Sequence, residues 1–237
     1  MVLYFRSTMI LSIKNIFDRS KWYFSASLVL IALLLILLLT FGKIKSFVLL
    51  NSFHSDFLDW FFIVFTNVGD GIFAILLALI ALLVYRNKTP GLAIIYSFLV
   101  SGILAQLMKR IVEAPRPGLI FQDTDYTKFV EGVKLAFYHS FPSGHTATAF
   151  AIVTVIATLM RSRKWQLQLL ILATLVGFSR IYLGQHFLED TIAGAGIGIL
   201  SGVVAIYLAN NYPWLNKFLK RKWENPISNP DQDHQFI

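Results

Sequence analysis

The feature that most constrains the fold is a series of long apolar runs without charge. Twelve consecutive residues from Leu28 to Leu39 are apolar, inside a longer stretch from Trp22 to Phe41. A helix needs about 20 predominantly apolar residues to cross the hydrocarbon core of a bilayer. Charged residues make up 14% of the chain, against about a quarter in soluble proteins. We therefore predict an integral membrane protein and exclude a soluble globular domain.

Six such stretches predict an all-α bundle of six transmembrane helices. A secretory signal has a shorter apolar region and a small-residue cleavage site, so we expect the first stretch to be retained as an anchor. The predicted divisions are a cytoplasmic N-terminal arm (1–21), the six-helix domain (22–223) and a disordered cytoplasmic tail (224–237). The predicted spans are Trp22–Phe41, Phe65–Tyr85, Pro90–Met108, Pro142–Met160, Trp165–Ser179 and Asp190–Ala209.

Lysine and arginine are distributed unevenly between the two sides of this bundle. Thirteen of the 21 basic residues fall on the side of the termini and eight on the other. Because loops rich in Lys and Arg stay in the cytoplasm, we predict a multi-pass protein of the inner membrane with cytoplasmic termini. The loop 111–141 then faces the periplasm or exterior, and its residues from Tyr126 to Phe141 predict short interfacial helices.

Ionisable side chains interrupt the apolar pattern at one common depth. Counted from the cytoplasmic end of each span at ~1.5 Å per residue, His145 and Arg180 lie about 24 Å away, Lys109 about 31 Å and His186 about 36 Å. The hydrocarbon core is about 30 Å thick, so all four fall near its outer boundary. Such groups are costly at this depth and tend to be functional, and a layer rich in cations favours an anion-binding site.

The sequence next to these residues favours the same interpretation. Arg116 follows Lys109 by seven residues and is flanked by two prolines, which direct the chain rigidly out of the helix and back toward the ammonium group. The segment Pro142–His145, PSGH, opens a helix whose free backbone N–H groups form a cradle for an anion. Asp190 follows His186 by four residues, so in a helix the carboxylate would fix the imidazole tautomer.

Two further features have less specific interpretations. Asp70 lies about five residues inside the outer end of its span, where it either pairs with a basic group of the site or begins a helix. The glycines of the last span recur every fourth residue, a spacing typical of close helix packing. They are Gly194, Gly198 and Gly202.

Three segments match the signatures of a known family. They are KRIVEAPRP (Lys109–Pro117), PSGH (Pro142–His145) and SRIYLGQHFLED (Ser179–Asp190), which fit K-x6-R-P, P-S-G-H and S-R-x5-H-x3-D at all eleven fixed positions. The chain resembles the type 2 phosphatidic acid phosphatase (PAP2) superfamily. Within it, the resemblance is to bacterial membrane-bound lipid phosphatases that act on phosphatidylglycerophosphate, undecaprenyl pyrophosphate or the 1-phosphate of lipid A.

The resemblance implies a phosphatase with an extracytoplasmic active site and a phosphohistidine intermediate. It implies that His186 is the nucleophile, that Asp190 orients it, and that His145 is the general acid and later the general base. It implies neither a metal nor another cofactor. The phosphoryl oxygens would be held by five further residues of the three signatures, which are Lys109, Arg116, Ser143, Gly144 and Arg180.

The expected partners are a lipid phosphate substrate and the bilayer, without nucleic acid or an obligate protein partner. A metal site of His145, His186 and Asp190 is disfavoured, because three nearby cations would repel a divalent ion. Two other functions use the same residues: a lipid phosphotransferase, in which a hydroxyl replaces water, and a non-catalytic transporter of anionic lipid. A transporter predicts charges continuing toward the inner leaflet, and the segments 147–160 and 191–208 contain none.

Overall fold

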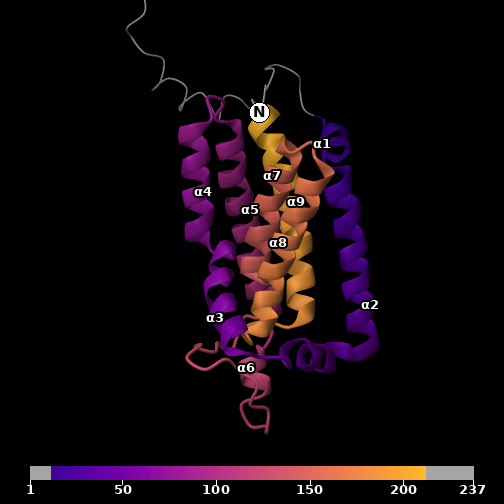
Figure 1. Ribbon diagram of the computed structural model, residues 1–237, viewed down its shortest axis with the longest axis vertical. Coiled ribbons are helices and arrows are strands. Elements are labelled where there is room, and N and C mark those ends of the chain that lie inside the picture. The colour runs from indigo at the N-terminus through magenta and orange to yellow at the C-terminus, as the bar shows by residue number, and fades with distance from the viewer. Residues whose placement is uncertain (1–11, 212–237) are drawn as a thin grey trace, which may run out of the picture.

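Nine α-helices and one 3-10 helix make up the part of the chain that the computed structural model describes, residues 12–211 (Figure 1). No strand occurs among these residues, and the predicted all-α class is confirmed. The elements are α1 (Ile13–Arg19), α2 (Lys21–Asn51), α3 (Asp56–Phe65), the 3-10 helix η1 (Thr66–Gly69), α4 (Gly71–Val84), α5 (Thr89–Val112), α6 (Pro117–Ile120), α7 (Gly144–Leu159), α8 (Arg163–Tyr182) and α9 (Leu188–Asn211).

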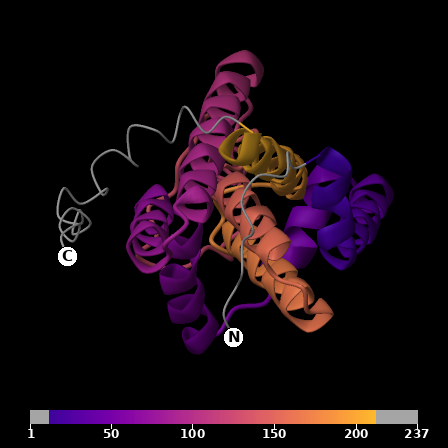
Figure 2. The ribbon, with the colours of Figure 1, turned by 90° about the horizontal axis from the view of Figure 1, so that it is seen from above.

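Helix α7 is the centre of the bundle and packs against α5, α8 and α9. Its sequence suits this position, since it is built mostly from Ala, Thr and Val, which allow neighbouring helices to approach closely. Helix α2 covers α8 and α9 from one side, and α4 lies against α5 (Figure 2). Large apolar side chains point outward instead; Leu39 is 82% exposed and Leu83 75%. An apolar exterior around a core of small residues suits a bundle surrounded by lipid.

The glycine stripe of α9 makes the contact with α7 possible. A Cβ atom at Gly194 would lie 2.6 Å from the carbonyl oxygen of Ser143, and one at Gly198 would collide with that of Ala147. The third glycine, Gly202, faces α7 in the same way. The predicted close packing is confirmed, and it fixes α9 against the helix that begins at the PSGH segment.

All six segments predicted to span the membrane are largely helical, but they are not equal in length. By length and composition, three described helical segments can cross a bilayer: α2, Thr89–Ile120 and α9. A fourth is the bent pair of Asp56–Gly69 and α4, whose two halves meet at 58°. Helix α7 is apolar but has only 16 residues, and α8 carries basic residues at both ends. The count of six crossings remains a prediction.

Two predicted boundaries are wrong. The helix predicted over Phe65–Tyr85 is interrupted, because η1 ends at Gly69 and the Asp70 side chain starts a new helix by accepting a hydrogen bond from the Ile72 N–H. The first helix also continues beyond Phe41 after a kink at Gly42, whose φ of 72° is a conformation that glycine adopts readily.

The prediction of short helices between Tyr126 and Phe141 is also wrong, since this segment consists of turns, bends and irregular chain. Instead, hydrogen bonds from side-chain and backbone groups of the loop attach it to the bundle. The Tyr126 hydroxyl donates to Asn51 Oδ1 over 2.5 Å, and the Ser140 N–H donates to the Ala114 carbonyl over 2.9 Å. The loop is therefore a fixed wall of the bundle end.

The described ends of the chain lie at one end of the bundle. Helix α1 belongs to the predicted N-terminal arm, and its Ile16 is fully buried where α1 packs on α7 and α9. Arg19, Leu159 and Asn210 line one small cavity at this end. The predicted tail 224–237 lies outside the described residues.

Candidate active site

The three signature segments meet at the end of the bundle opposite α1. Lys109 lies in the last turn of α5, the PSGH segment begins α7, and Arg180 lies in the last turn of α8. The loop from α8 to α9 carries His186, and Asp190 lies in the first turn of α9. Helices that alternate in direction bring these ends together, as the depth count predicts.

His186 and Asp190 form a buried pair. His186 Nδ1 lies 3.4 Å from Asp190 Oδ2, and the two side chains are 2% and 0% exposed. Oδ2 also accepts hydrogen bonds from the Ser140 hydroxyl (2.5 Å) and the Phe187 N–H (2.8 Å). The predicted contact between the two side chains is present. However, His186 precedes α9, so the two residues do not share one helix face. A turn closed by the Phe187 bond brings them together.

The surroundings of His186 favour a neutral ring. Burial lowers the pKa of the imidazole below its ordinary value, and the guanidinium groups of Arg116 and Arg180 act in the same direction, against the opposing effect of Asp190. A neutral ring that directs Nδ1–H toward the carboxylate keeps a lone pair on Nε2. This is the state of an imidazole that can act as a nucleophile.

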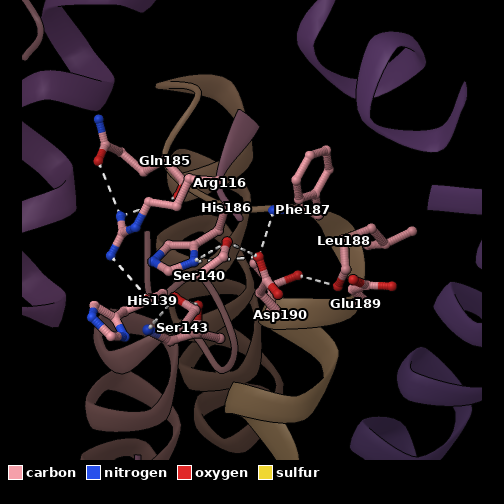
Figure 3. Close-up of polar contacts among 12 residues, drawn as sticks. Arg116, His139, Ser140, Ser143, Gln185, His186, Phe187, Leu188, Glu189 and Asp190 are labelled. Carbon is pink, nitrogen blue, oxygen red and sulfur yellow. Dashed lines mark hydrogen bonds and ion pairs between the residues drawn. The ribbon is translucent and has the colours of Figure 1, made fainter. Parts of the chain in front are cut away.

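Arg116 lies on the other side of the His186 ring from Ser140 and Asp190 (Figure 3). Its Nε donates to the Tyr138 carbonyl over 2.9 Å, and Nη1 donates to the Gln185 carbonyl over 3.1 Å. These bonds come from the loop before α7 and the loop before α9, so the guanidinium group holds the two loops together. Its position is fixed before any substrate binds.

Arg180 is a second fixed cation and is 9% exposed. Its Nη1 donates to the Thr66 hydroxyl in η1 over 2.7 Å, whereas its buried Nε has no hydrogen-bond partner in the part of the chain that the structure describes. A buried guanidinium N–H without a partner is costly. An anionic oxygen placed beside Arg180 Nε would accept a hydrogen bond from this N–H.

Lys109 completes the cationic group. It interacts electrostatically with Arg116, Arg180 and Asp190, so the ammonium group faces the same space. Within residues 12–211, its side chain forms no ion pair. Three cations, from the end of α5, the chain that follows α5 and the end of α8, therefore surround one volume with a single buried carboxylate behind it. This arrangement is suited to an anion with more than one charge.

The start of α7 faces this volume with its free N–H groups. Ser143 is the N-cap; its Oγ accepts from the Thr146 N–H (3.4 Å) and the Thr146 hydroxyl (2.8 Å), which leaves its own hydrogen free to donate. Gly144 is the first helical residue, so its N–H is unpaired within the helix. His145 follows, and its Nε2 lies 3.8 Å from Asp70 Oδ2. Both alternatives predicted for Asp70 are therefore present: the residue starts a helix, and it faces a basic group of the site.

The structure also brings residues to the site that lie outside the three signatures. Ser140 binds Asp190 and lies 3.5 Å from His186 Nδ1, Thr66 binds Arg180, and Gln185 binds Arg116. A small hydroxyl residue two positions before the PSGH proline was a local signal for Ser140. Thr66 is more than 100 residues from Arg180, and only the fold reveals that contact.

No group of three His, Asp or Glu side chains suited to a metal ion occurs among residues 12–211. His186 and Asp190 are paired with each other, while His145 faces Asp70. The side chains brought together at this site are imidazoles, carboxylates, hydroxyls and fixed cations.

Comparison with known proteins agrees with this geometry. The chain is 30% identical over 147 residues to phosphatidylglycerophosphatase B of Bacillus subtilis (strain 168), covering 57% of this chain and 67% of that protein. It is 28% identical over 177 residues to lipid A 4'-phosphatase of Porphyromonas gingivalis, covering 71% and 74%. The crystal structure of Aquifex aeolicus LpxE superposes with a TM-score of 0.61 at 31% identity, covering 69% of this chain and 94% of that one.

The family model described as the PAP2 superfamily matches residues 90–214, which is more than half of the chain. The matched region contains all three signature segments, and the resemblance inferred from those segments is confirmed. This chain belongs to the PAP2 superfamily.

Proposed function

We propose that this protein removes the terminal phosphate from a lipid phosphate or pyrophosphate at the outer face of the membrane. The observation that carries the proposal is the His186–Asp190 pair, whose imidazole is buried beside the guanidinium groups of Arg116 and Arg180. A phosphate is the anion that needs both several positive groups and a nucleophile. The names of the relatives support a lipid as the remainder of the substrate.

The proposed reaction has two steps. In the first, the Nε2 lone pair of His186 attacks phosphorus, and the bond from phosphorus to the lipid oxygen breaks. His145 gives that oxygen its proton, so the lipid leaves as an alcohol, or as a phosphate if the substrate is a pyrophosphate. In the second, His145 takes a proton from water, the water oxygen bonds to phosphorus, and the bond to Nε2 breaks. Inorganic phosphate and the free enzyme result.

The remaining residues stabilise charge in both steps. Asp190 offsets the positive charge that the His186 ring acquires when it is phosphorylated. The equatorial oxygens of the transition state carry the spreading negative charge, and groups fixed around them lower the barrier. In this proposal those groups are Lys109, Arg116, Arg180, the Ser143 hydroxyl and the Gly144 N–H.

A direct assay tests this function. We expect the purified protein in detergent to release inorganic phosphate from at least one of phosphatidylglycerophosphate, undecaprenyl pyrophosphate, phosphatidic acid and lipid A, and to do so in EDTA. Phosphate found on an added alcohol instead of in solution would identify a phosphotransferase. Binding of these lipids without any release would identify a transporter, and loss of release in EDTA would contradict the metal-free mechanism.

We also propose that the termini lie in the cytoplasm of the cell's inner membrane and that the site faces the periplasm or exterior. The excess of basic residues on the side of the termini supports this orientation. So does the position of α1 and the end of α9 at the opposite end from the site.

Labelling of single cysteines in intact cells tests the orientation. The chain contains no cysteine, so a cysteine introduced at one position is the only reactive thiol. Thr127 is exposed in the loop before α7, and Ser162 is exposed in the short loop before α8. We expect an impermeant maleimide to label Thr127→Cys in whole cells and Ser162→Cys only after lysis. The reverse pattern would place the site in the cytoplasm.

A further inference from the structure

The break between α3 and α4 places a carboxylate beside the general acid of the proposed reaction. Asp70 is the residue at this break, and its two oxygens have different partners. Oδ1 accepts a hydrogen bond from the Ile72 N–H (2.8 Å) and so begins α4, while Oδ2 lies 3.8 Å from His145 Nε2, within ion-pair distance. One side chain therefore joins the start of α4 to the start of α7.

The preceding residue fixes this approach. Gly69 ends η1 directly against the first turn of α7, where a Cβ atom would lie 2.8 Å from the His145 carbonyl oxygen and 2.6 Å from Val176 Cγ1. A larger residue would push η1 away from α7 and move the carboxylate with it. Thr66, at the other end of η1, binds Arg180. The short turn from Thr66 to Asp70 thus contacts two residues of the candidate site.

The charged groups around His145 indicate how the Asp70 carboxylate acts on the ring. Arg180, Lys109 and Arg116 all interact electrostatically with the imidazole, and so does the Asp70 carboxylate. A general acid must carry its proton when the substrate is bound. A proton on the ring adds a positive charge among three cations, and the facing carboxylate offsets that charge by Coulomb attraction.

We propose that Asp70 is a positioning residue that offsets the positive charge of the protonated His145 ring and holds its Nε2–H toward the carboxylate, so that Nδ1 gives its proton to the leaving oxygen. In this step the Nδ1–H bond breaks and the lipid oxygen–hydrogen bond forms, while the Nε2 proton stays between the ring and Asp70. This inference rests on the acid role of His145 in the proposed function. It assigns a fourth sequence element, Thr66–Asp70, to the catalytic machinery.

Substitution of Asp70 by Asn distinguishes the effect of its negative charge on His145 from its role as the N-cap of α4. Asn is as good an N-cap as Asp, so Asp70→Asn keeps the start of α4 and removes only the charge. An alkyl phosphate needs a proton on its leaving oxygen, whereas the leaving group of 4-nitrophenyl phosphate is stable as an anion. Comparing kcat/KM for the two substrates reports on the first step alone, because later dephosphorylation does not enter this ratio.

We expect Asp70→Asn to lower kcat/KM for the alkyl phosphate by about tenfold, which is a fraction of the effect of a general acid. The kcat/KM for 4-nitrophenyl phosphate should change much less. In a His145→Ala background the same substitution should cause no further loss, since Asp70 acts through the ring. Asp70→Glu should restore part of the alkyl activity. The upper limb of the pH profile for the alkyl substrate should move to lower pH in Asp70→Asn.

Asp56→Asn is the matched control, because this exposed carboxylate lies in the first turn of α3 and has no contact with His145. It should leave both kcat/KM values and the pH profile unchanged. Equal losses on both substrates, a loss that persists in His145→Ala, or full alkyl activity in Asp70→Asn would each overturn the inference. A wild-type protein that releases phosphate from neither substrate would overturn the proposed function, and this inference with it.

Discussion

We expect phosphate release from a lipid phosphate to fall at least about a thousandfold in the His186→Asn variant, because the substitution removes the proposed nucleophile. The Asn amide can place an N–H where Nδ1–H stands, so the contact with Asp190 (3.4 Å in the wild type) has a replacement. No lone pair replaces that of Nε2. Wild-type protein briefly exposed to radiolabelled substrate and then denatured should carry a label that base preserves and acid removes. The variant should carry none.

His139→Asn is the control for this experiment. His139 is exposed at the same end of the bundle and has a φ of 57°, a left-handed conformation that Asn tolerates. This variant should release phosphate at the wild-type rate and form the labelled protein. Normal turnover in His186→Asn, or a wild-type label that survives acid, would show that His186 is not the phosphorylated residue.

The convergence of the site could be predicted from the sequence because helix geometry is regular. A constant rise per residue places His145, Arg180, Lys109 and His186 at similar depth from one boundary, and alternating helix directions then bring their ends together. The structure places these four at one end of the bundle. The glycines of α9 were predictable for a similar reason, since a spacing of four residues defines one face of a helix.

Other parts of the site depend on contacts that no local pattern encodes. The sequence from Phe65 to Tyr85 is apolar enough for one continuous helix, but Asp70 can cap a helix, and capping competes with continuation. The loop from Tyr126 to Phe141 contains residues that would suit an interfacial helix. It is held instead by bonds such as that from Tyr126 to Asn51, which join residues 75 positions apart.

Replacing Asp190 by Asn should lower kcat about a thousandfold or more, a loss approaching that seen when the carboxylate of the serine protease triad is made neutral. The Oδ2 atom accepts hydrogen bonds from the Ser140 hydroxyl and the Phe187 N–H and lies 3.4 Å from His186 Nδ1, so its charge acts on all three groups. An amide oxygen retains the shape but cannot offset the positive charge of a phosphorylated ring. We therefore expect the rate of phosphoenzyme formation to fall, measured by rapid quenching with radiolabelled substrate.

Glu189→Gln is the matched control, because this neighbouring carboxylate is partly exposed and pairs with Lys43 over 2.6 Å on the far side from the ring. It should leave phosphoenzyme formation unchanged. The double variant His186→Asn/Asp190→Asn should lose no more activity than His186→Asn alone, since residues that act as a unit are not additive. If the two losses instead multiply, Asp190 acts independently of the ring. The carboxylate would then contribute through the position of Ser140 and the start of α7, whose Ser143 N–H donates to the Asp190 carbonyl over 3.0 Å.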